Sequence, residues 1–144
     1  MLHDPFVAAA YAIAVVATLL MLRHVARVWP NAPARVPLHL GIDGRPGMLA
    51  PRPFLWLGPG IVAAVVVYLG VALATTPPYA ASPLVLALVY VILAEMAALV
   101  GWLAGLQVQI GRNQTFRIAP TRLLLAVGPI ILTILALVYV SATP

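Results

Sequence analysis

The chain has 144 residues, of which 64% are hydrophobic and 8% are charged, and its formal net charge is +5. A soluble domain carries about a quarter of its residues as charged side chains, so this composition excludes a water-soluble fold and predicts one membrane domain over residues 1–144. All eight basic residues are arginines set between apolar runs, which indicates orientation in a lipid bilayer and no nucleic-acid partner. The absence of cysteine excludes disulfides and thiolate chemistry.

The first predicted element is a membrane helix over residues 5–28. Asp4 stands at the N-cap position, and Pro5 follows at the first helical position, where its missing N–H would have no partner. An acidic residue ahead of the apolar run favours a membrane helix over a signal peptide, which begins with basic residues. Trp29 and Pro30 are expected to end the helix at the membrane surface.

A polar loop is predicted over residues 29–52. Apolar residues occupy every second position from 36 to 42, and this period of two indicates a short extended strand. The dipeptide Asp43-Gly44 is typical of a tight turn. Because a free hairpin is marginally stable in water, we expect a small hairpin whose apolar face packs on the helix ends.

Three further membrane helices are predicted over residues 54–76, 83–109 and 122–141. Glu95, near the centre of the third, is the only charge inside any apolar run. A carboxylate at mid-bilayer costs about 2.5–3.5 kcal/mol, so Glu95 should face the bundle interior. The structural interpretation is an interhelical hydrogen bond to Thr133 or Tyr68, which lie at similar depth. The functional interpretation is a proton relay or an ion site.

Small residues also recur along the third helix. Gly101 and Gly105 fit the small-xxx-small pattern that lets helix backbones approach closely in membranes. This stripe predicts either packing within the chain or a homo-oligomer through Gly101 and Gly105.

The arginines predict the orientation. Five lie in or beside the first loop and three in the third, whereas the second loop and both termini have none. With four spans, both basic loops share one side, which the positive-inside rule makes cytoplasmic. We therefore expect an all-α, multi-pass protein of the cell membrane with four transmembrane helices and both termini outside.

The loop carries a recognisable motif. Residues 33–46 read Pro-Ala-Arg-Val-Pro-Leu-His-Leu-Gly-Ile-Asp-Gly-Arg-Pro. This resembles the signature Pro-x-Arg-x-Pro-x-His-(Phe/Leu)-(Asn/Gly)-x-x-Gly of a bacterial and archaeal membrane family that shares a domain of unknown function. The resemblance covers about a tenth of the chain. Gly47, Met48 and Leu49 stand where that family has an acidic residue and a tryptophan-glycine pair. The motif residues are Arg35, Pro37, His39, Gly41, Asp43 and Gly44.

The best-known members of that family are immunity proteins for a secreted sporulation-delaying toxin, and they also hold a repressor at the membrane. The resemblance implies a non-enzymatic binding or signalling protein whose motif loop contacts a protein or peptide, with no cofactor. One alternative is a small transporter or channel-like subunit that uses Glu95. Another is a metal-dependent membrane enzyme centred on His39, but His39 and Asp43 have no third ligand fixed nearby, so no metal site is predicted.

Overall fold

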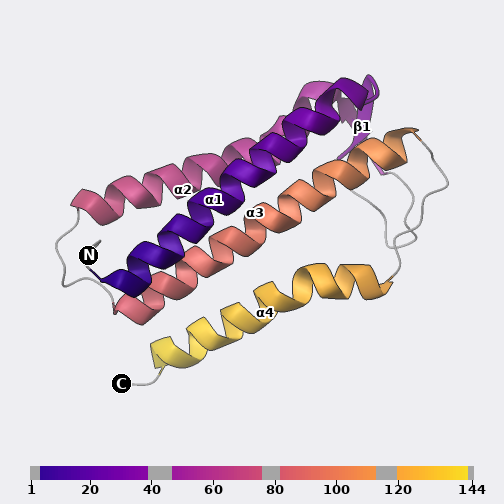
Figure 1. Cartoon of the computed structure of the whole chain (residues 1–144). Helices are drawn as coiled ribbons and strands as arrows, with labels where there is room; N and C mark the ends of the chain where they lie inside the picture. Colours follow the sequence, from indigo (N-terminus) through magenta and orange to yellow (C-terminus); the bar gives the residue numbers. More distant parts are fainter. Residues whose placement is uncertain (1–3, 39–46, 76–81, 113–119, 143–144) are drawn as a thin grey trace.

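Four long helices dominate the computed structural model, which describes residues 4–38, 47–75, 82–112 and 120–142. Each is long and apolar enough to cross a membrane, which confirms the predicted fold class. The described part of the connection between the first and second helices contains two short strands and two 3₁₀ turns (Figure 1). In chain order the elements are α1 (Pro5–Val28), η1 (Trp29–Asn31), β1 (Arg35–Pro37), β2 (Leu49–Pro51), η2 (Arg52–Trp56), α2 (Leu57–Thr75), α3 (Pro83–Arg112) and α4 (Pro120–Ala142).

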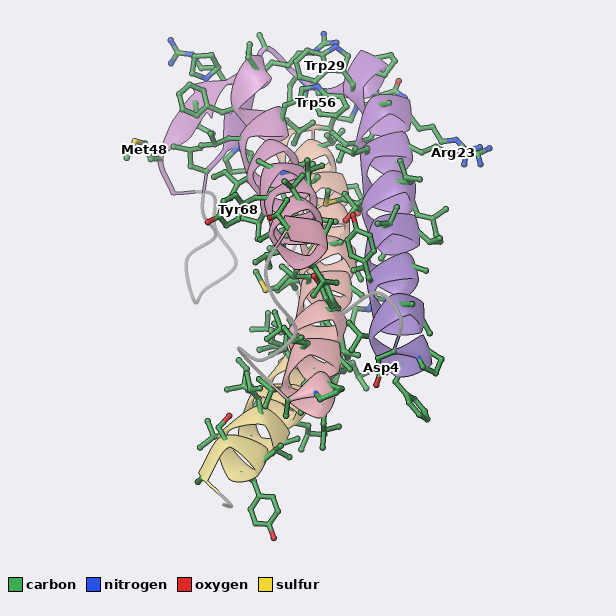
Figure 2. All side chains as sticks on the ribbon, turned by 90° about the vertical axis from the view of Figure 1, so that its left-hand side faces the viewer. Asp4, Arg23, Trp29, Met48, Trp56 and Tyr68 are labelled. Carbon is green, nitrogen blue, oxygen red and sulfur yellow. The ribbon has the colours of Figure 1, made fainter. Side chains whose placement is uncertain are left out.

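The N-terminus of α1 is capped as the sequence predicts. One carboxylate oxygen of Asp4 accepts hydrogen bonds from the backbone N–H groups of Phe6 and Val7, at 2.9 and 3.2 Å. These two donors would otherwise have no partner at the start of the helix. Figure 2 shows Asp4 at the opposite end of the molecule from Trp29 and Trp56.

Consecutive helices run in opposite directions, so α1 and α3 run parallel to each other (Figure 1). These two make the most extensive helix contact in the described chain. Ala14 and Ala97 are fully buried, and small side chains of this kind let the two backbones approach closely. α4 lies against α3 and is nearly all on the outside, with 6% of its apolar window buried.

The small-residue stripe of α3 faces α1 within the chain. A Cβ built on Gly101 would lie 3.4 Å from Cγ of Met21, and one on Gly105 would lie 3.0 Å from Nε2 of His24. At both glycines, therefore, the stripe packs within the chain, which is one of the two arrangements that the sequence predicts.

The polar loop forms a two-stranded stem, defined here as β1 and β2. The strands are antiparallel, and Val36 pairs with Ala50. Val36 is 1% exposed, in a core cluster with Val25 of α1 and Val108 of α3, so the predicted packing of an extended segment on the helix ends is correct here. Leu38, predicted on the same face, is 37% exposed, although its backbone N–H still donates to the carbonyl of Met48.

The helix boundaries lie within a few residues of the predicted ones. α2 begins at Leu57 rather than at residue 54, because η2 forms a tight 3₁₀ turn that contains Pro53. α3 runs three residues beyond the predicted 109, to Arg112. α4 continues through Pro129, which is tolerated where other groups satisfy the freed backbone.

Candidate functional site

The stem holds the beginning of the sequence motif at the end of the bundle that carries the arginines. Pro37 is buried, and its carbonyl oxygen accepts a 2.8 Å hydrogen bond from the side-chain amide of Gln107 on α3. Arg35 is exposed on β1. The remaining motif residues lie outside the described residues: His39, Gly41, Asp43 and Gly44.

An arginine-tryptophan cluster fixes the base of the stem. The guanidinium carbon of Arg52 lies 4.2 Å from the ring centroid of Trp29, and the rings of Trp29 and Trp56 are 6.1 Å apart. The backbone N–H of Arg52 donates to the carbonyl of Ala34 at 3.0 Å, joining η2 to the residue before β1. A cation over a tryptophan face is worth about 0.5–2 kcal/mol. Arg52 is therefore occupied inside the chain.

The end of α3 is tied to the same region. Arg112 donates a 3.1 Å hydrogen bond to the side-chain oxygen of Asn31 in η1. A Cβ on Gly111 would lie 2.6 Å from Cγ of Pro33, so only glycine lets the chain ahead of β1 pack this closely on α3. These contacts attach η1 and the chain ahead of β1 to α3, and Val36 of the stem packs in one cluster with Val25 of α1.

Glu95 forms the hydrogen bond that the sequence predicts. The hydroxyl of Thr133 on α4 lies 3.0 Å from Oε1 of Glu95, and 3.1 Å from the carbonyl of Pro129 one turn earlier. Tyr68, the other predicted partner, is 71% exposed and points away from the bundle (Figure 2). The polar contact of Glu95 is therefore with α4 and not with α2.

The second carboxyl oxygen of Glu95 differs from the first in its hydrogen bonding. Oε2 is buried and has no hydrogen-bond partner among the described residues. A buried polar atom without a partner costs about 1–3 kcal/mol, so it is a place where a proton, an ion or a ligand would be stabilising. No charged side chain of the described ranges pairs with Glu95. The site can therefore accept a hydrogen bond or a proton, but among the described residues no second titratable side chain is bonded to Glu95 to pass a proton on.

A groove that sequence reasoning missed runs between α1 and α3, with a volume of about 500 Å³. We call it the α1–α3 groove. Its floor includes Ala97 and Gly101, and its polar lining consists of His24, Gln109 and Arg122, together with the indole of Trp102. The sequence signals were present separately, as the glycine stripe and the basic helix ends, but neither says which helices are neighbours.

The described residues contain no group of three histidine, aspartate or glutamate side chains close enough to share a metal ion. Comparisons with protein-family models, with curated proteins and with solved structures found no match to this chain.

Proposed function

We propose that this chain is a non-enzymatic membrane protein that binds a protein or peptide partner through the polar segment between β1 and β2. The observation that carries the proposal is the anchored stem. Val36 is in the core, Pro37 is hydrogen-bonded to Gln107, and Arg52 is stacked on Trp29. A stem fixed in this way holds both ends of the segment, which lowers the ordering cost of binding.

The resemblance of the motif supports a proteinaceous partner. Family members with this signature confer immunity to a secreted toxin or hold a regulator at the membrane, and we propose the same class of role here. Arg35, exposed on the stem, and the polar side chains of His39 and Asp43 would supply the contacts. By the positive-inside rule, the end with the arginines and the stem faces the cytoplasm, so the partner approaches from there.

Photo-crosslinking in cells tests this proposal. A photoreactive residue at position 39 should give one discrete adduct, identified by mass spectrometry, whereas the same residue at the exposed position 68 on α2 should give lipid adducts only. Arg35→Ala should weaken the adduct from position 39. Gly60→Ala is the matched control, because a Cβ at Gly60 meets nothing within 4 Å. If position 39 captures only the helices of this chain, the segment is a structural brace and the proposal fails.

A second candidate is a small transporter or channel-like subunit, and the unpartnered Oε2 of Glu95 favours it. The variant Glu95→Gln distinguishes the two candidates. It keeps an acceptor for Thr133 but removes the exchangeable proton and the charge. A transporter reconstituted in vesicles should lose ion or proton flux. A receptor should keep the adduct from position 39 at its wild-type yield.

A further inference from the structure

The α1–α3 groove combines an apolar floor with a polar end. Its floor is made of small residues, including Ala97 and Gly101. Three polar side chains, those of His24, Gln109 and Arg122, line the groove at the end of the bundle that carries the stem. His24 is in the last turns of α1, Gln109 in the last turn of α3, and Arg122 in the first turn of α4.

These polar groups are available to a ligand. His24, Gln109 and Arg122 are all exposed, and within the described part of the chain none of them has a hydrogen bond or ion pair. They differ in this from Arg52 and Arg112, which are engaged by Trp29 and Asn31. Arg122 donates through a planar fork that matches a phosphate, Gln109 adds an amide N–H, and imidazole adds another donor.

The electrostatics of the groove favour an anion. Among the described residues no aspartate or glutamate lines it, and the chain has only three acidic residues in all. Glu95, the one acid within α3, is bonded to Thr133 of α4. An anion between Arg122 and His24 would therefore meet donors and positive charge without an opposing carboxylate.

The length of the groove fits one lipid leaflet. From Ala97 to Gln109 a helix rises roughly 18 Å at 1.5 Å per residue, and one leaflet of hydrocarbon is about 15 Å thick. The floor would therefore lie beside an acyl chain while the polar end lies at the level of the headgroup. The floor is narrow at Gly105, where an added Cβ would lie 3.0 Å from Nε2 of His24 and the imidazole would have to shift slightly.

From this match of charge and length we propose that the α1–α3 groove is a binding site for an anionic phospholipid. Its phosphate is bound by Arg122, His24 and Gln109, and one acyl chain lies along the small residues of α3. Basic pockets between transmembrane helices recognise lipid headgroups by this combination of contacts. The site is separate from the stem, so it neither requires nor excludes the proposed partner.

The test is native mass spectrometry of the full chain released from nanodiscs that contain phosphatidylglycerol and phosphatidylcholine in equal amounts. We expect phosphatidylglycerol to be retained in preference. Arg122→Gln should lower that preference about fivefold, the equivalent of about 1 kcal/mol for one arginine in direct contact with an anionic headgroup. Arg23→Gln is the matched control, because Arg23 has the same charge near the same end but extends away from the bundle (Figure 2). It should leave the preference unchanged.

A steric variant tests the floor. Ala98 lines the groove and is exposed, so Ala98→Phe should fill the groove and abolish retention of both lipids while the helices still form. Equal retention of the two lipids would overturn the proposal, and so would equal losses in Arg122→Gln and Arg23→Gln. Displacement of the lipid by soluble glycerol phosphate would assign the site to a free phosphate, and a dimer without lipid would assign the groove to a second copy.

Discussion

The hydrogen bond between Thr133 and Glu95 shows how a single polar pair is used inside an apolar bundle. It joins α4, which is nearly all lipid-facing, to α3. The sequence alone predicts this pair, because a mid-bilayer carboxyl needs a partner and Thr133 lies at the right depth. The sequence cannot exclude Tyr68 as the partner of Glu95. The residues of α2 are apolar on all sides, so hydropathy does not show which face of α2 points toward α3.

Thr133→Val should therefore destabilise the docking of α4. Interhelical hydrogen bonds in membranes are worth about 0.6 kcal/mol and at most about 1.7 kcal/mol. Valine keeps the shape and removes the hydroxyl, so a loss in this range is expected when unfolding is measured by titration with a denaturing detergent. Thr75→Val is the control, since among the described residues the hydroxyl of Thr75 is bonded only to carbonyls of its own helix. A loss in Thr75→Val as large as that in Thr133→Val would contradict this account.

Gly70 is a second position where one atom decides the packing. A Cβ there would overlap the phenol of Tyr11, whose Cζ would be only 2.7 Å away. Tyr11 has little freedom to move, because its ring packs edge-on against Tyr90 at 5.2 Å between centroids. Gly70→Ala should cost about 1–3 kcal/mol of stability through overpacking. Gly60→Ala, in the same helix with open space around it, should be neutral or stabilising in the same detergent titration.

At the scale of elements, the four helices follow from sequence because long apolar runs have one solution in lipid. The stem is harder to predict. Val36 is correctly expected to be extended and buried, but the partner strand Leu49–Pro51 is short and contains a proline, so it gives almost no strand signal. The stem forms because it packs on α3, and a local sequence pattern does not predict those tertiary contacts.

The attachment of the stem to α3 is testable through Gly111. Gly111→Ala places a methyl group against the ring of Pro33, so the stem should move off α3 and expose Val36. Because the chain has no cysteine, Val36→Cys supplies a single reporter. The Val36→Cys variant by itself should be protected from a maleimide. The double variant with Gly111→Ala should react. Gly128→Ala, which meets nothing within 4 Å, should leave Cys labelling slow. Rapid labelling of Val36→Cys by itself would show that the stem is not anchored.

At the scale of the whole molecule, the arrangement of helices puts the stem at one end and both described termini at the other (Figure 1). The sequence predicts this sidedness from the arginines, but it does not predict that α1 and α3 are neighbours. The groove between them is therefore not predicted from the sequence, although all of its lining residues belong to three predicted helices.

The predicted orientation can be measured with two single-cysteine variants. Met48→Cys lies directly before β2 of the stem, where the side chain is exposed, and Ser141→Cys lies near the end of α4. In intact cells a membrane-impermeant maleimide should label Ser141→Cys at once and Met48→Cys only after permeabilisation, because the arginine-bearing loops are retained in the cytoplasm. The reverse pattern would place the stem outside the cell and redirect the search for its partner.

The parallel pairing of α1 with α3 also has a consequence for biosynthesis. The two helices that make the most extensive contact with each other in the described chain are separated in the sequence by all of α2. A ribosome that adds about 5–20 residues per second needs roughly 4–17 seconds to go from the end of α1 to the end of α3. During that interval the face of α1 that includes Ala14 lacks its partner helix, so the insertion machinery or a chaperone has time to hold the nascent chain.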